Sequence, residues 1–133
     1  MTFYEEEIQK NIDNLEKEGR LSLTKGFIQH GNVSVYEHCL AVCVCSIKIA
    51  RMLRIRYDLR ALIRGALLHD YFLYDWHVND DPNRKLHGFF HPSVALENAL
   101  KDYELSKKEQ DIIKHHMFPL TIIPPMCREA WLI

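Results

Sequence analysis

The chain has 133 residues, of which 17 are basic and 18 acidic, so its formal net charge is −1, and 47% of its residues are apolar. This size and apolar content are typical of one globular domain and argue against intrinsic disorder. The near-neutral charge lacks the basic excess that general nucleic-acid binding needs, so the composition gives no strong signal for a nucleic-acid partner. Eight histidines are the unusual feature of the composition.

The segments that direct export or membrane insertion are missing from this sequence. Met1–Glu7 contains neither a basic start nor an apolar run, so no secretory signal is predicted. The longest strongly apolar stretch, Cys39–Cys45, is far shorter than the ~20 residues that span a bilayer. The four cysteines show no Cys-x-x-Cys spacing and fit reduced thiols. We therefore expect a soluble, cytoplasmic protein that has no membrane partner.

The first half of the chain shows helical periodicity. An apolar stripe at helical spacing predicts a helix over about residues 3–18, closed by Gly19. The segment that follows, through Gly31, is expected to be irregular. Ser34–Glu37 is a capping box that opens a long helix ending near Leu53.

The third predicted helix is capped by Asp58 and runs directly into His69-Asp70. From Tyr71 to Phe90 the periodicity breaks, and turn-forming residues predict a long loop. Pro92 then suits the first turn of a helix through Leu100.

The last part of the chain again shows helix signals. Ser106–Glu109 is a second capping box, which opens a helix ending at His115-His116. A final helix is expected from Met126, and its apolar end at Ile133 has no C-cap, as if the chain stopped in mid-helix. With no convincing strand and no linker, the sequence predicts a single all-α domain over residues 1–133, a compact bundle of six or seven helices.

Chemistry is expected where polar groups interrupt an apolar helix. His69 and Asp70 follow an apolar run without a solvated spacer, and burying them is costly unless they are paired or bind a metal. Both could contact one ion near the helix end, and His38 could supply a third ligand. Nitrogen and oxygen ligands together suit Mn, Fe, Co, Ni or Zn, and Mg less well.

This arrangement resembles the HD-domain superfamily of metal-dependent phosphohydrolases over about residues 34–133. The resemblance is carried by His38, by Gly65–Asp70 with its small and aliphatic lead-in, by His91-Pro92 and by Ile112–His116. It implies an all-helical fold and a divalent metal held by His38, His69 and Asp70. It further implies that His91, His115 and His116 serve a second metal ion or the substrate phosphate.

The chain departs from the usual pattern of this superfamily in two places. Members usually complete the first metal site with an Asp on a later helix, but no Asp follows Asp111. We expect that ligand beyond Ile133 of a longer natural chain, with Glu129 as a weaker substitute. Many relatives also carry a Gly-Lys turn after the His-Asp pair, which is replaced here by Tyr71–His77.

Several residues could take over contacts with the substrate phosphate. Asp75 and His77 could partly replace the missing Lys, although a capping or hydrogen-bonding role for Asp75 is an equally open interpretation. Arg64 is assigned to phosphate binding, because it belongs to a basic stretch over residues 48–64 that could attract an anionic substrate. A solvated basic face is the simpler interpretation of that stretch.

The resemblance implies a metal-dependent phosphohydrolase that acts on a small phosphate ester, with a nucleotide as the expected class. His69 and Asp70 would be its catalytic residues, and Asp70 would be both a ligand and the base that orients water. The alternative is a catalytically inactive HD module that binds metal or nucleotide in a regulatory or interaction role. A purely structural helical protein is a third hypothesis. The apolar C-terminal strip could pair with a second copy of the chain.

Overall fold

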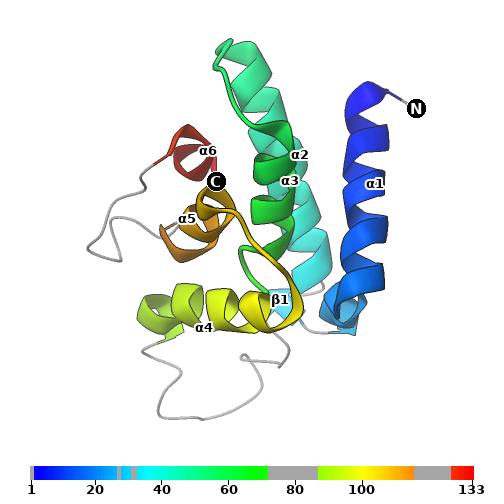
Figure 1. Ribbon diagram of the computed structural model, residues 1–133, viewed down its shortest axis with the longest axis vertical. Helices are drawn as coiled ribbons and strands as arrows, with labels where there is room; N and C mark the ends of the chain where they lie inside the picture. Colours follow the sequence, from blue (N-terminus) through cyan, green and yellow to red (C-terminus); the bar gives the residue numbers. More distant parts are fainter. Residues whose placement is uncertain (1, 27, 31–32, 72–86, 116–126) are drawn as a thin grey trace.

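The computed structural model describes residues 2–26, 28–30, 33–71, 87–115 and 127–133, and for residues 28–30 and 87–93 it describes the backbone alone. The described residues form six α-helices, one 3-10 helix and a two-stranded hairpin (Figure 1). The helices pack around one hydrophobic core, so the predicted all-α fold class is confirmed.

The N-terminal helix, α1, spans Phe3–Glu18 as the apolar stripe predicts. The Thr2 side chain accepts a hydrogen bond from the Glu5 N–H and so caps the helix. Ile8, Ile12 and Leu15 of the apolar stripe are buried, together with Asn11, and the Gly19 N–H closes the last turn on the Leu15 carbonyl. A 3-10 helix, η1, follows over Leu21–Gly26.

A small hairpin lies between η1 and the next helix. Strand β1, Ile28–His30, pairs antiparallel with strand β2, Val33–Ser34. The expectation of no strand was wrong at this point. The strands have three and two residues, which is too short for the alternating pattern that identifies a strand in a sequence.

Two central helices form an antiparallel pair, in which the start of α2 lies beside the end of α3 (Figure 1). Helix α2 spans Val35–Met52 and helix α3 spans Leu59–Leu68. Both predicted caps are present, because Ser34 Oγ accepts from the Glu37 N–H and Asp58 Oδ1 accepts from the Ala61 N–H.

Three further helices surround this pair. Helix α4 spans His87–Asp102 and lies across the end of the bundle where α2 begins, α5 spans Lys107–His115, and α6 spans Arg128–Leu132 (Figure 1). The predicted capping box of α5 is complete, since Ser106 Oγ accepts from the Glu109 N–H and Glu109 Oε1 accepts from the Ser106 N–H.

The start of α4 differs from the prediction. The helix begins at His87, five positions before Pro92, so the predicted loop was too long at its C-terminal side. Proline favours the first turn of a helix because it has no N–H to donate, but a helix can continue across it when that one bond is lost. The position of Pro92 therefore did not mark the helix start.

Helix α3 is the most enclosed element of the bundle, since every residue from Ala61 to Leu68 is buried. Gly65 faces helix α5, where a Cβ atom at this position would lie only 2.5 Å from Ile112 Cδ1 and 2.8 Å from Ile112 Cγ2. The absence of a side chain at Gly65 thus allows the two helices to approach closely.

We predict that Gly65→Ala destabilises the protein even though alanine favours helix formation. Overpacking against Ile112 costs about 1–3 kcal/mol, and the better helix propensity of alanine offsets only about 1 kcal/mol of that loss. Urea unfolding measures the difference. Gly26→Ala is the matched control, because nothing lies within 4 Å of a Cβ atom there. A smaller cost of Gly65→Ala in an Ile112→Ala background would locate the clash, and equal costs would contradict it.

Candidate metal centre

The antiparallel pair of α2 and α3 brings three predicted metal ligands together. His38 lies in the first turn of α2, and His69 and Asp70 directly follow the last residue of α3. Asp70 Oδ2 is 3.3 Å from His38 Nε2 and 3.4 Å from His69 Nε2. One potential ligand atom from each of the three residues lies within 4.8 Å of the other two.

The imidazole of His69 is oriented by its own helix. His69 Nδ1 lies 2.6 Å from the carbonyl oxygen of Ala66. Because a carbonyl oxygen can only accept, Nδ1 carries the proton, and the lone pair of the neutral ring is on Nε2, the atom close to Asp70. A histidine that binds a metal is commonly held in this way, with its second ring nitrogen donating to a backbone carbonyl.

The three residues differ in their exposure to solvent. His69 and Asp70 are each 3% exposed, whereas the side chain of His38 is 27% exposed. The cluster is therefore closed on the α3 side and open to solvent on the α2 side. A ligand or substrate would approach past His38.

The geometry of the cluster fits a divalent transition metal. Two protein ligands that each lie ~2.0–2.2 Å from a tetrahedral ion are separated from each other by about 3.3–3.6 Å. The two distances from Asp70 Oδ2 to the histidine nitrogens, 3.3 and 3.4 Å, agree with this separation. Two imidazole nitrogens and one carboxylate oxygen suit Mn, Fe, Co, Ni or Zn.

Cys39 borders the cluster from the face of α2 that is directed into the core. Its side chain is buried, and this burial, together with the negative charge of Asp70, raises the pKa of the Cys39 thiol well above its usual value. The thiol is therefore neutral and packs as a small apolar group beside the carboxylate.

The second predicted group of histidines is only partly described. His115 occupies the last turn of α5, where its Nδ1 lies 2.5 Å from Asp111 Oδ1. Asp111 Oδ2 also accepts from the Cys127 N–H, at 2.8 Å. His91 lies in α4, but its side chain is outside the described residues, as is the whole of His116. A joint site of these three histidines stays a prediction.

Arg64 does not have the position that phosphate binding needs. It is only 2% exposed, and its guanidinium donates to Glu109 Oε1 at 3.1 Å and to the Glu104 carbonyl at 3.1 Å. Arg64 is thus a core residue that links α3 to α5, and these contacts give no support to its predicted phosphate-binding role. The sequence suggested a basic face here, but the apolar residues around Arg64 are the stronger signal.

Two other predicted substrate residues, Asp75 and His77, lie outside the described residues. Glu129, the suggested substitute ligand, lies at the wrong end of α3. Its carboxylate accepts from the Asp58 N–H and pairs with Lys108, at 3.5 and 3.3 Å. Asp58 precedes His69 by eleven positions, which is about 16 Å along a helix, so Glu129 is not a ligand of this cluster.

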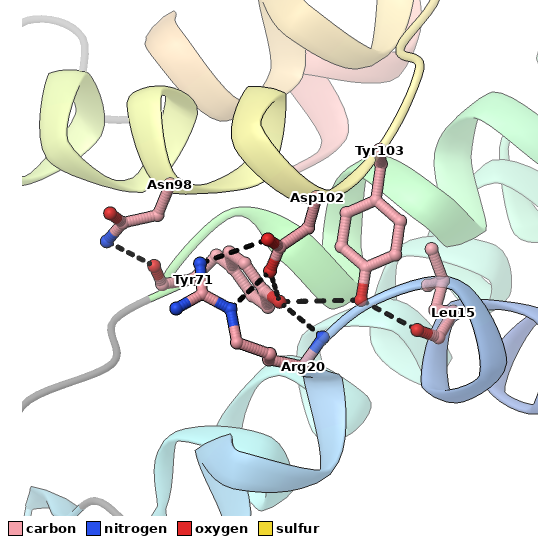
Figure 2. Close-up of polar contacts among 6 residues, drawn as sticks. All are labelled: Leu15, Arg20, Tyr71, Asn98, Asp102 and Tyr103. Carbon is pink, nitrogen blue, oxygen red and sulfur yellow. Dashed lines mark hydrogen bonds and ion pairs between the residues drawn. The ribbon is translucent and has the colours of Figure 1, made fainter.

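The residue that follows Asp70 is held by a network that the sequence did not predict. The hydroxyl of Tyr71 accepts from the Arg20 N–H and donates to Asp102 Oδ2, at 2.9 and 2.5 Å (Figure 2). Asp102 also binds the Arg20 guanidinium through two bonds of 2.8 and 3.0 Å. A single tyrosine in an apolar sequence context gives no signal for such a network.

Electrostatics keep the groups of this network in defined protonation states. Burial disfavours the charged form of Asp102, but hydrogen bonds from Arg20 and Tyr71 outweigh it and lower the pKa of Asp102. Burial, assisted by the bond to Asp102, raises the pKa of Tyr71. Asp102 is therefore an anionic acceptor, and Tyr71 stays a donor.

Comparison with known proteins assigns the chain to a family. Residues 35–133 match the HD domain, which covers most of the chain, and the protein belongs to the HD domain family. No curated protein and no solved structure shows a significant match. Members of this family are generally metal-dependent hydrolases, and the His38, His69 and Asp70 cluster is a group that could hold a metal ion.

Among the helices of the described residues, none is both long and apolar enough to cross a membrane.

We predict that Arg64→Met lowers the stability of the protein by about 3–5 kcal/mol, because it removes the buried guanidinium partner of the Glu109 carboxylate and leaves only the exposed Arg60, at 3.9 Å. Chemical denaturation measures this loss. In the double variant Arg64→Met/Glu109→Gln the uncompensated charge is gone, so part of the stability should return. Unchanged stability of Arg64→Met would contradict the stabilising role of this ion pair.

The lowered pKa of Asp102 predicts how the stability of the protein falls at acid pH. A carboxyl whose folded pKa lies below its unfolded value of ~3.9 contributes stability above that value, and this contribution is lost as the pH falls through the folded pKa. The wild type should therefore lose stability more steeply below about pH 4 than Asp102→Asn does. Thermal unfolding between pH 2.5 and 6 tests this, and parallel curves would contradict it.

Proposed function

We propose that the chain is a metal-dependent phosphohydrolase that acts on a small phosphate ester, with a nucleotide as the expected class of substrate. The observation that carries the proposal is the convergence of His38 Nε2 and His69 Nε2 on one carboxylate oxygen of Asp70, with distances that suit a shared ion. Membership of the HD domain family supports the same chemistry.

The cluster supplies what hydrolysis of a phosphate ester requires at neutral pH. A bound divalent metal would lower the pKa of water toward ~7 and neutralise negative charge that develops on the phosphoryl oxygens. His38 and His69 are placed to act as neutral nitrogen ligands. The hydrogen bond from His69 Nδ1 to Ala66 keeps the Nε2 lone pair directed into the cluster.

Asp70 would have two roles in this proposal. Its Oδ2 atom, between the two imidazoles, is the oxygen ligand. A carboxylate has two oxygens with about four acceptor sites, so Asp70 can bind an ion and also accept a proton from a water molecule held beside it. The partly exposed side chain of His38 marks the face from which a phosphate ester would enter.

The proposal predicts that Asp70→Asn loses metal and activity together while the fold is retained. Removing a group that only hydrogen-bonds to a metal ligand costs about 10–100-fold in metal affinity, so replacing a ligand itself should cost at least that much. Calorimetric titration with Mn²⁺ measures the affinity, and turnover of p-nitrophenyl phosphate, bis-p-nitrophenyl phosphate and nucleoside monophosphates measures the activity. The matched control is Asp13→Asn, an exposed carboxylate on α1, which should change neither.

The outcomes separate the proposed function from its alternative. Binding of Mn²⁺ that is lost in Asp70→Asn, together with turnover, supports the hydrolase. Binding without turnover of any of these esters would favour a module that binds metal or nucleotide in a regulatory role. If the wild type binds no Mn²⁺, Ni²⁺ or Zn²⁺ and shows no thermal shift with them, the metal-dependent function is wrong.

A further inference from the structure

The position of Asp70 depends on residues outside helix α3. The helix ends at Leu68, so Asp70 lies beyond the regular backbone hydrogen bonds that fix side-chain positions along a helix. The turn is held on its N-terminal side by the bonds from the His69 N–H and ring to the Ala66 carbonyl. On the C-terminal side of the turn, the residue that follows Asp70 is Tyr71.

Tyr71 is fixed through its backbone as well as through its side chain. Its N–H donates to the Leu68 carbonyl at 3.1 Å, and its own carbonyl accepts from Asn98 Nδ2 at 3.2 Å. The hydroxyl is held between the Arg20 N–H and Asp102 Oδ2. Three separate parts of the structure, the end of α3, helix α4 and the segment after α1, thus hold this one residue (Figure 2).

We propose that Tyr71, held by Arg20 and Asp102, is a positioning residue that sets the place of the Asp70 carboxylate for metal binding. This inference rests on the proposed metal-dependent function. Its physical reason is that a metal site tolerates ligand displacements of only ~0.5 Å, so the residue next to a ligand outside a helix must itself be immobile. Tyr71 is fully buried, and its backbone and hydroxyl hydrogen bonds hold it in place.

The network also gives a role to the part of the chain that precedes the family match. The HD domain match begins at residue 35, whereas Arg20 lies in the N-terminal segment. From that segment come the N–H that binds Tyr71 and the guanidinium that holds Asp102. The N-terminal segment is therefore a support of the candidate metal centre as well as a covering of the core.

Tyr103 offers a matched control for Tyr71. It directly follows α4, and its hydroxyl donates to the Leu15 carbonyl of α1 at 2.7 Å. It is therefore a second buried phenol that binds the N-terminal part of the chain. The two rings pack edge to face, and their hydroxyl oxygens lie 3.4 Å apart. Only Tyr71 is adjacent to Asp70. Removing either hydroxyl should disturb packing to a similar degree, while only one removal should reach the carboxylate.

The experiment compares Tyr71→Phe with Tyr103→Phe in the whole chain. Both variants should unfold at a lower temperature than the wild type. At a temperature where all three proteins are folded, we expect Tyr71→Phe to bind Mn²⁺ about 10-fold more weakly, the size of effect known for groups that orient metal ligands. Tyr103→Phe should bind Mn²⁺ as the wild type does. Calorimetric titration gives both affinities.

A second pair of variants tests the part played by Arg20. Arg20→Ala keeps the backbone N–H to Tyr71 but removes the guanidinium from Asp102, so its affinity for Mn²⁺ should fall by less than that of Tyr71→Phe. The control is Lys25→Ala, five positions after Arg20. It removes an exposed ion pair to Glu16 and should leave the affinity for Mn²⁺ unchanged.

Each result decides the matter. Equal Mn²⁺ affinity in wild type and Tyr71→Phe would overturn the positioning role and leave the proposed function standing. Equal weakening in Tyr71→Phe and Tyr103→Phe would also overturn it, because the effect would then not be specific to the residue next to Asp70. A wild type that binds no metal would overturn the proposed function and this inference together.

Discussion

The burial of helix α3 is the constraint on which the rest of the structure depends. Every residue from Ala61 to Leu68 is enclosed, so neighbouring helices must cover the element on all sides. Gly65 permits the close approach of α5. Between the two helices, the Arg64 guanidinium donates hydrogen bonds to the Glu109 carboxylate and the Glu104 carbonyl. A helix enclosed in this way has a fixed position, and the candidate metal ligands His69 and Asp70 directly follow its last residue.

The location of the candidate metal centre follows from that arrangement. A buried helix that ends in His69 and Asp70 places an imidazole and a carboxylate in the interior, where partners are required. The antiparallel neighbour α2 begins at the same end of the bundle and supplies His38. A histidine and a carboxylate that look unfavourable in isolation therefore form a compact group of ligands that remains open to solvent on one side.

Support of the turn after α3 comes from distant parts of the chain. Tyr71 is bound by Arg20 from the N-terminal segment and by Asp102 from α4, and the low pKa of Asp102 keeps that acceptor charged. The same groups join α1 to the bundle. Stability of the N-terminal helix and placement of the candidate ligands thus depend on shared bonds, which links the segment before the family match to the proposed chemistry.

The sequence by itself determined the local features, because caps and apolar periodicity act within a few residues. The bounds of α1, the caps at Ser34 and Asp58 and the capping box at Ser106 were all predictable in this way. The three ligands of the candidate centre were predicted from polar groups that interrupt apolar helices and from a resemblance in short motifs. Only the tertiary structure decided the burial of Arg64 against Glu109 and the network at Tyr71. These contacts join residues 45 and 51 positions apart, and no local pattern encodes such pairings.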